Sequence, residues 1–165
     1  IIYGVSAFGL SNQTNLTRGE SKEIIDNYFK SYPKLKEYMS NQISYARENG
    51  YVETILKRKR YLPEINSRNA ILRSSAERNA INTPVQGSAA DIIKLAMIKI
   101  DSEIEKKSLK SKLILQVHDE LVFDVHLPEL NIVKEIVSYN MENAIQIDVP
   151  LKVEIGYGDN WLVAH

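Results

Sequence analysis

Apolar residues recur every three or four positions after Thr17 and again after Pro33, which predicts two amphipathic helices in the first third of the chain. Thr17-Arg18-Gly19-Glu20 has the Ser/Thr-x-x-Glu form of a capping box, so the first helix begins there. Pro33 suits the first turn of the second helix, and Gly50 is typical of its end.

Two pairs of short segments predict β-hairpins. Residues 51–56 form a strand on which residues 59–62 pair back. Further along, the runs 113–117 and 121–125 flank His118-Asp119-Glu120, which predicts a second hairpin with acidic residues at its tip. Both pairs are antiparallel because so few residues separate their strands.

Between the hairpins, the pattern predicts two helices separated by a break. Ser67 caps a helix that runs to about Ile81, and Thr83-Pro84 ends it, because the residue before a proline avoids the helical region. A longer helix then covers about 86–107. Its expected buried face consists of Val85, Ala89, Ile92, Ile93, Ala96, Ile100 and Ile104.

The C-terminal third adds an amphipathic helix over 128–143 and a last strand over 151–157. Helices mixed with a few strands predict an α+β fold in which a mostly antiparallel sheet packs with helices.

Composition narrows the class of protein without indicating a function. The 165 residues are 44% hydrophobic and 25% charged, so the chain is one globular domain or one piece of a larger one. The formal net charge is zero, so total charge argues neither for nor against a nucleic-acid partner. The absence of cysteine excludes disulfides, cysteine-ligated zinc and thiol nucleophiles, and favours a reducing compartment.

The longest stretch without a charge is 1–17. It contains two glycines and many polar residues and lacks a basic region, so it predicts neither a membrane span nor a signal peptide. We therefore expect no membrane partner. Because the chain opens on Ile1 without an initiator methionine, we expect a piece cut from a longer chain.

The acidic tip of the second hairpin is the most informative segment. Asp119 and Glu120 repel each other at a tight turn unless a cation or water neutralises them. Carboxylate oxygens suit Mg²⁺, which takes one or two protein carboxylates together with substrate phosphates. The alternative is an ordinary exposed turn, where Asp and Glu are common and His118 is a surface or packing residue.

A second candidate site is a polar track on the central helices. Arg78 and Asn82 are four residues apart and share a helical face, and Gln86 follows across the expected break. These side chains can donate to the acceptors that every base pair shows in the minor groove. They therefore suit binding that depends on duplex geometry and not on sequence. The alternative is a plain polar helix face.

The third candidate is the basic run of the first hairpin, Lys57, Arg58, Lys59 and Arg60, which suits phosphate contacts but also an ordinary solvated loop. Near the N-terminus, Tyr3 sits in a glycine-punctuated segment that matches no phosphate-binding loop, and from its context alone it is a packing aromatic.

Taken together and in order, the motifs resemble one protein family. They are Tyr3-Gly4 with Phe8-Gly9-Leu10, Gly50-Tyr51-Val52-Glu53-Thr54, Arg60-Tyr61-Leu62-Pro63, Ala76-Glu77-Arg78-Asn79-Ala80-Ile81-Asn82, Pro84-Val85-Gln86-Gly87-Ser88-Ala89-Ala90-Asp91, Gln116-Val117-His118-Asp119-Glu120, Asn160-Trp161 and Ala164-His165. This ordered set is similar to the C-terminal part of family A DNA polymerases, the bacterial DNA polymerase I family, over essentially the whole chain.

The resemblance implies a right-hand polymerase architecture, with the end of the fingers and an adjoining hairpin at about 1–66 and the palm at about 67–165. It implies that Asp119 binds the two catalytic Mg²⁺ ions, that Glu120 supports the metal site, and that His118 lies near the primer terminus. It assigns the polar track to the minor groove of the primer-template and Tyr3 to the nascent base pair.

The resemblance also implies DNA-templated DNA synthesis in replication and repair, with primer-template DNA and dNTP as partners and a cytoplasmic, nucleoid-associated location. The family's other catalytic aspartate, its triphosphate-binding residues and its thumb lie upstream of these residues. We therefore expect the chain to need the rest of the polymerase and to be inactive alone.

Two alternatives stay open at this point. Single-subunit RNA polymerases share the Tyr-Gly and His-Asp elements but usually continue with Ser where this chain has Glu120. A duplex-binding palm module without catalysis is disfavoured by the acid pair, which weakens DNA binding when no metal is present. The chain also departs from the resemblance, since family members often have a glycine within 55–59 and this chain has none.

Overall fold

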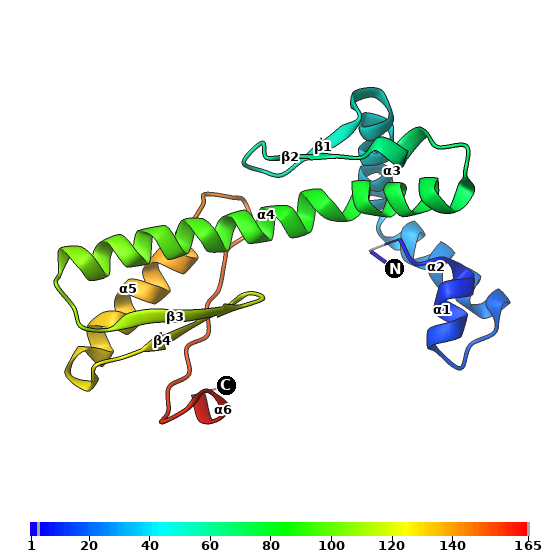
Figure 1. Cartoon of the computed structure of the whole chain (residues 1–165). Helices are drawn as coiled ribbons and strands as arrows, with labels where there is room; N and C mark the ends of the chain where they lie inside the picture. The colour runs from blue at the N-terminus through cyan, green and yellow to red at the C-terminus, as the bar shows by residue number, and fades with distance from the viewer. Residues whose placement is uncertain (3, 165) are drawn as a thin grey trace. The chain divides into compact units, whose positions relative to one another are not determined.

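The computed structural model describes residues 1–2 and 4–164, and it divides the chain into two compact units, Ile1–Ser88 and Ala89–His165. Helix α4 (Ala70–Lys106) supplies residues to both units (Figure 1). The described strands form two separate two-stranded antiparallel sheets among helices, so the expected α+β class is confirmed. The expected boundary near 66 between fingers and palm stays a prediction.

Three helices open the first unit: α1 (Ala7–Gln13), α2 (Arg18–Ser31) and α3 (Pro33–Asn49). The predicted capping box is confirmed, since Thr17 Oγ1 accepts the Glu20 N–H while a Glu20 carboxylate oxygen accepts the Thr17 N–H at 2.8 Å. Gly50 ends α3 in the left-handed region at φ 78°, which a residue without Cβ adopts freely.

The first hairpin follows directly. Strand β1 (Tyr51–Glu53) pairs with β2 (Lys59–Tyr61), with Val52 opposite Arg60, and a 3₁₀ turn (Pro63–Asn66) comes next. The strand predicted over 51–56 is therefore shorter. Its second half turns, because the Lys57 N–H already donates to the Thr54 carbonyl. The hairpin packs its inner face into a core of Ala46, Val52, Leu62, Ile65, Ala76 and Ala80.

Helix α4 corrects the predicted break at Thr83-Pro84. The helix is continuous for 37 residues with Pro84 inside it. A proline inside a helix removes one backbone hydrogen bond and crowds the preceding turn, and tertiary burial outweighs that local cost here, since Ala80, Ile81 and Thr83 are all buried. The predicted buried face is right from Ile93 onward and wrong at its start, because Val85 and Ala89 are exposed.

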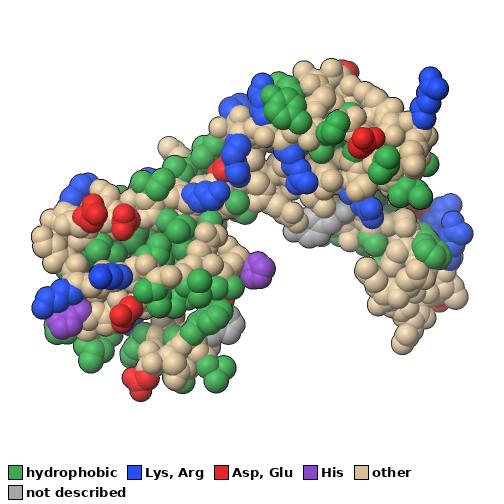
Figure 2. Space-filling view, in the orientation of Figure 1, with side chains coloured by type: hydrophobic (Ala, Val, Ile, Leu, Met, Phe, Trp, Pro, Cys, Tyr) green, Lys and Arg blue, Asp and Glu red, His purple; other side chains and the backbone are tan. Residues whose placement is uncertain are grey.

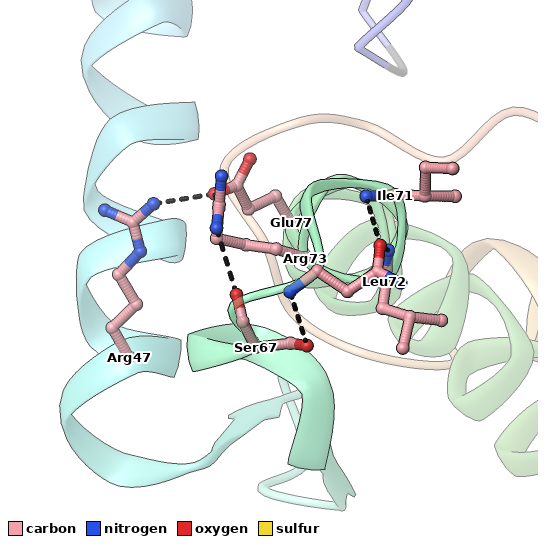
Figure 3. A network of polar contacts seen from close by, with 7 residues as sticks. Arg47, Ser67, Ile71, Leu72, Arg73 and Glu77 are labelled. Carbon is pink, nitrogen blue, oxygen red and sulfur yellow. Dashed lines mark hydrogen bonds and ion pairs between the residues drawn. The ribbon is translucent and has the colours of Figure 1, made fainter.

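The start of α4 is also not where the sequence placed it. The capping residue is Asn69, whose Oδ1 accepts the N–H groups of Ile71 at 2.9 Å and Leu72 at 3.4 Å, whereas Ser67 Oγ accepts the Asn69 N–H (Figure 3). Arg73 then donates back to the Ser67 carbonyl at 2.9 Å. Ser67 thus supports the cap, and the helix begins two residues later than a Ser67 cap implies.

An ion pair joins α3 to α4 close to this cap. The Arg47 guanidinium lies 2.6 Å from the Glu77 carboxylate, and Arg73 approaches the same oxygen at 4.0 Å (Figure 3). All three side chains are partly exposed, so the network fixes geometry more than it adds stability.

The second unit contains β3 (Lys112–Val117), β4 (Glu120–Asp124), a 3₁₀ turn (Leu127–Glu129), α5 (Leu130–Glu142) and α6 (Trp161–Ala164). Strands β3 and β4 form the predicted hairpin, and Figure 1 shows α5 alongside the second half of α4. The core of this unit is Ala96, Ile100, Ile104, Val133, Ile136, Val137 and Ala144.

The strand predicted over 151–157 is wrong. These residues are described and adopt no regular structure. A strand persists only when its backbone groups pair with a neighbour, and each sheet formed by the described residues contains only two strands. The alternating apolar residues over 151–157 are therefore not enough to form a strand without a partner strand. Within residues 1–2 and 4–164, no helix is long and apolar enough to cross a membrane.

Glu129 fixes the start of β3 to the turn before α5. Its carboxylate accepts the N–H groups of Lys110 and Ser111 at 3.0 Å and the Ser111 hydroxyl at 2.7 Å. The bond from the Lys110 amide, followed by that from the Ser111 hydroxyl, holds the pKa of Glu129 below its usual value of 4.5. The ionised carboxylate is therefore the form that the fold prefers.

The lowered pKa makes the contribution of Glu129 depend on pH. The contribution of Glu129 to the free energy of unfolding is complete above its unfolded-state pKa. It is lost as the pH falls through the lower folded-state pKa. We expect Glu129→Gln to lower the unfolding temperature of the full-length protein at neutral pH, and the difference from wild type to close as the pH falls through the lowered folded-state pKa. Thermal unfolding across pH measures this, and a difference that does not change with pH would contradict it.

Candidate active site and nucleic-acid interface

The tip of the β3–β4 hairpin is a tight turn that contains His118 and Asp119. Val117 pairs with Glu120, so only these two residues connect the strands. His118 adopts the left-handed region at φ 53°, a conformation in which histidine is enriched but which still costs energy for a residue with a Cβ. Gln116 braces the turn by donating from Nε2 to the His118 carbonyl at 3.0 Å.

The two acids occupy different surroundings at this tip. The Asp119 side chain is exposed, whereas Glu120 is half-buried at the first position of β4. The predicted acidic tip is therefore present, with one carboxylate presented to solvent by a braced turn and the other set back beside it.

The donor set fits Mg²⁺ in part. Asp119 and Glu120 supply only oxygen ligands, as a hard cation that keeps waters and binds substrate phosphates requires. Among residues 1–2 and 4–164, however, no group of three or more His, Asp and Glu side chains is arranged to hold a metal ion. These acids therefore fit one side of a magnesium site that needs further ligands from substrate or from other residues.

The polar track lies on one uninterrupted helix. Because α4 continues through Pro84, Arg78, Asn82 and Gln86 follow one another at four-residue spacing along one stripe, each about 40° further round the axis. Arg78 and Gln86 are exposed and Asn82 is half-buried. Within the described residues, Asn82 Oδ1 is buried without a hydrogen-bond partner. Arg78 and Gln86 therefore carry exposed donors on this stripe, which suits a minor-groove contact.

The four basic side chains of the first hairpin each contact another residue of the first unit. Lys57 lies 3.5 Å from the Glu53 carboxylate, and Lys59 Nζ lies 4.1 Å from the centre of the Tyr51 ring. The two arginines reach α4. Arg58 donates to the Gly87 carbonyl at 3.2 Å and Arg60 donates to the Thr83 hydroxyl at 3.1 Å.

The structure thus brings two predicted sites together in the first unit. The basic hairpin and the polar track of α4 are joined by side-chain hydrogen bonds, and Figure 2 shows Lys and Arg side chains over the hairpin and the adjoining part of α4. Tyr3, predicted to border a nascent base pair, lies outside the described residues.

A small aromatic and cationic cluster covers the outer face of the same hairpin. The hydrogen bond between Tyr45 and Tyr51 is the main cause that raises the pKa of Tyr45 to about 12. The same bond and the nearby Lys59 ammonium lower the pKa of Tyr51. Lys59 is therefore held against Tyr51, which limits its reach toward a phosphate.

Lys57 explains how the hairpin forms without the glycine that the resemblance leads one to expect. It adopts the left-handed region at φ 64°. That conformation costs a residue with a Cβ roughly 1–2 kcal/mol, and glycine avoids most of this cost. The turn therefore keeps a shape suited to glycine while carrying a lysine.

We expect Lys57→Gly to stabilise the first unit by about 0.5–1 kcal/mol, because relief of backbone strain exceeds the loss of an exposed ion pair and the extra chain entropy of glycine. Lys57→Ala is the matched control, since it loses the same ion pair but keeps a Cβ. Denaturant unfolding of both variants measures the difference, and equal stability would show that the backbone conformation carries no strain.

Sequence reasoning missed three residues that shape these sites. Gln116 was recognised only as part of a motif, although an amide two residues before a tight turn is a signal for a bond across it. Thr83 was interpreted only as part of a helix break, and Ser88 received no role. Gly87, which lies between Gln86 and Ser88, was the signal for a close approach at this place. Both hydroxyls bind the first hairpin.

Comparison with solved structures identifies the class of fold. The chain superposes with a TM-score of 0.96 and 45% sequence identity on a protein described as the POL domain of Pol1 from M. smegmatis in complex with DNA primer-template and dNTP. The match covers 99% of this chain and 29% of that one. The chain therefore has the fold of part of a polymerase domain.

Comparison of sequences identifies the family. Residues 1–163 match the family described as DNA polymerase family A. The chain is 52% identical to DNA polymerase I of Caldicellulosiruptor bescii over 161 residues and 48% identical to that of Bacillus subtilis, with 98% of this chain covered in each case. It belongs to DNA polymerase family A. It spans about a fifth of the length of these relatives, 19% and 18% respectively.

Proposed function

We propose that the chain works as part of a longer DNA polymerase that adds dNTPs to a primer 3′-hydroxyl under the direction of a template, in bacterial DNA replication and repair. Family membership supports this reaction, and so does the likeness to a polymerase domain described with primer-template and dNTP. The observation that carries the proposal is the exposed Asp119 beside Glu120 on a braced hairpin tip. The place of action is the bacterial cytoplasm, at the nucleoid.

The hairpin tip is the proposed catalytic part of the chain. Asp119 binds catalytic Mg²⁺, Glu120 supports the same site from its half-buried position, and His118 lies near the primer terminus. When bound, Mg²⁺ would supply Lewis-acid stabilisation of phosphate charge and would ease loss of the primer hydroxyl proton. In the reaction, the 3′-oxygen bonds to the α-phosphorus and the bond to pyrophosphate breaks. The turn braced by Gln116 restricts the backbone beside Asp119, which reduces the reorganisation needed when substrate arrives.

The polar track and the basic hairpin are the proposed duplex-binding parts. Arg78, Asn82 and Gln86 donate to minor-groove acceptors that all base pairs share, so they test pairing geometry and not sequence. The basic run Lys57–Arg60 lies near backbone phosphates, and Tyr3 borders the nascent base pair. Phosphate contacts hold and orient the duplex, and minor-groove contacts test the shape of each base pair, which is the division that a template-directed enzyme needs.

Primer extension by the full-length protein with Mg²⁺ tests the proposal. We expect templated incorporation of dNTPs in preference to rNTPs. Preferred rNTP incorporation would support the RNA polymerase alternative, and duplex binding without any synthesis would support a non-catalytic module. The 165 residues alone are the matched negative control, because their described residues supply only part of a metal site.

A further inference from the structure

Helix α4 is locally weak at Pro84, beside the residues that are proposed to contact the duplex. Proline has no N–H, so the turn that ends at Pro84 lacks one hydrogen bond of the helical ladder. Asn82 and Gln86 lie two residues before and two residues after it. Small changes in helical rotation at this point would move both side chains relative to the duplex.

The β1–β2 hairpin contacts α4 at this same turn through three hydrogen bonds. The Ser88 hydroxyl accepts the Ile55 N–H at 2.8 Å and donates to the Pro84 carbonyl. The Thr83 hydroxyl accepts from Arg60 at 3.1 Å, and the Gly87 carbonyl accepts from Arg58 at 3.2 Å. Helix residues 83, 87 and 88 are therefore each joined to the hairpin.

Gly87 allows the hairpin to approach this closely. A Cβ at position 87 would stand 2.7 Å from the Thr54 methyl group, which is closer than real Cβ contacts. Thr54 and Thr83 are both buried, so water does not separate the two elements there. The contact is tight packing reinforced by hydrogen bonds, and it defines the position of the helix closely.

The hairpin holds the side of α4 that faces away from the polar track. Each residue advances about 100° around the helix axis, so Thr83, Gly87 and Ser88 are centred roughly 140° from the stripe of Asn82 and Gln86. The hairpin therefore fixes the rotation of the helix through contacts on the side opposite the polar track, and it leaves the polar track accessible. Gln86 is accordingly exposed.

We propose that the β1–β2 hairpin is a clamp on α4 and that the hydroxyls of Thr83 and Ser88 are positioning residues, which orient Asn82 and Gln86 toward the minor groove of the primer-template. This inference rests on the proposed function. It gives Arg58 and Arg60 a structural task on α4 in addition to the phosphate contacts proposed for the basic run.

The test uses Ser88→Ala and Thr83→Val in the full-length protein, because both remove a clamp hydroxyl and neither removes a charge. Ser88→Thr restores the hydroxyl, and Ser102→Ala removes a hydroxyl from α4 in the other unit as a control. We expect the maximal rate of primer extension to fall about five- to twenty-fold in the first two variants, with near wild-type rates in the other two.

Salt dependence separates positioning from phosphate binding. Loss of one phosphate contact reduces the slope of log affinity against log salt by about 1, whereas a clamp variant keeps every cation and should keep the wild-type slope. A reduced slope in Thr83→Val would show that Arg60 acts mainly on phosphate and would overturn the positioning role of Thr83. Folded Ser88→Ala protein that extends at the wild-type rate would overturn that of Ser88.

Hydrogen exchange keeps the clamp testable if the proposed function fails. The Ile55 amide donates to Ser88, so Ser88→Ala should speed its exchange several-fold and Ser88→Thr should not. Absence of primer extension in the wild-type protein would reject the polymerase proposal, and the Ile55 exchange rate would still decide whether the hairpin is held. Unchanged exchange in Ser88→Ala overturns the clamp.

Discussion

Asp119→Ala is expected to reduce templated dNTP incorporation by the full-length protein at least about a thousand-fold while primer-template binding survives. The reason is the position of the side chain. Asp119 is the exposed acid of a turn that the Gln116 bond braces, and it is proposed to hold the metal that offsets phosphate charge. Binding survives because the duplex is proposed to be held by the polar track and the basic hairpin.

The hairpin offers a matched control for this experiment. Asp124 is an exposed acid at the other end of β4, opposite Lys112, so Asp124→Ala removes the same charge from the same element away from the turn. We expect it to extend primers at close to the wild-type rate. Single-turnover extension and filter binding separate chemistry from affinity. Normal extension by Asp119→Ala would mean that the acids form only a surface turn.

Asn82→Ala is expected to lower primer extension about ten- to a hundred-fold without lowering the unfolding temperature. The rate of primer extension falls because a minor-groove donor is lost. The unfolding temperature is kept because the buried Asn82 Oδ1 atom has no hydrogen-bond partner among the described residues. A buried acceptor in that state costs the fold about 1–3 kcal/mol, and alanine removes it. Activity and stability should therefore change independently.

Asn69→Ala provides the opposite pattern and so serves as the control. It removes the cap of α4 and is expected to cost about 1 kcal/mol of stability while extension is retained. Thermal unfolding and extension kinetics on both variants test the pair. If Asn82→Ala loses activity only in proportion to lost folded protein, Asn82 is a structural residue and its assignment to the duplex fails.

Sequence alone predicted the elements whose signals are local. The capping box at Thr17, the proline that opens α3 and the left-handed Gly50 each depend on chemistry within one turn of the chain, and all three are confirmed. The β3–β4 hairpin was predictable for the same reason, because the apolar runs on either side of His118-Asp119-Glu120 leave a turn of only two residues.

Long-range packing decided the elements that were mispredicted. Pro84 carries a strong local signal to stop a helix, yet buried neighbours and hairpin contacts 23 to 33 residues away keep α4 continuous. The residues over 151–157 alternate like a strand but have no partner strand among the described residues. Neither outcome is encoded in the local pattern.

The candidate site was predictable as a set of residues and much less as an arrangement. Family resemblance named His118, Asp119 and Glu120, and the structure gathers them at one turn, while their roles stay predictions. The bonds of Thr83 and Ser88 were not predictable, because the neighbouring Gly87 indicates a close approach of another element but not which element approaches or which hydroxyls it binds.

The two hairpins also bear on how the chain folds. Within the described residues, every strand pairs with the next strand along the chain, so all β pairing is local in sequence. Hairpins of this kind form in about 1–10 μs, and local contacts are reached early because they close short loops. During synthesis, each hairpin can therefore form soon after it leaves the ribosome, and the slower steps are the docking of helices that are distant in sequence.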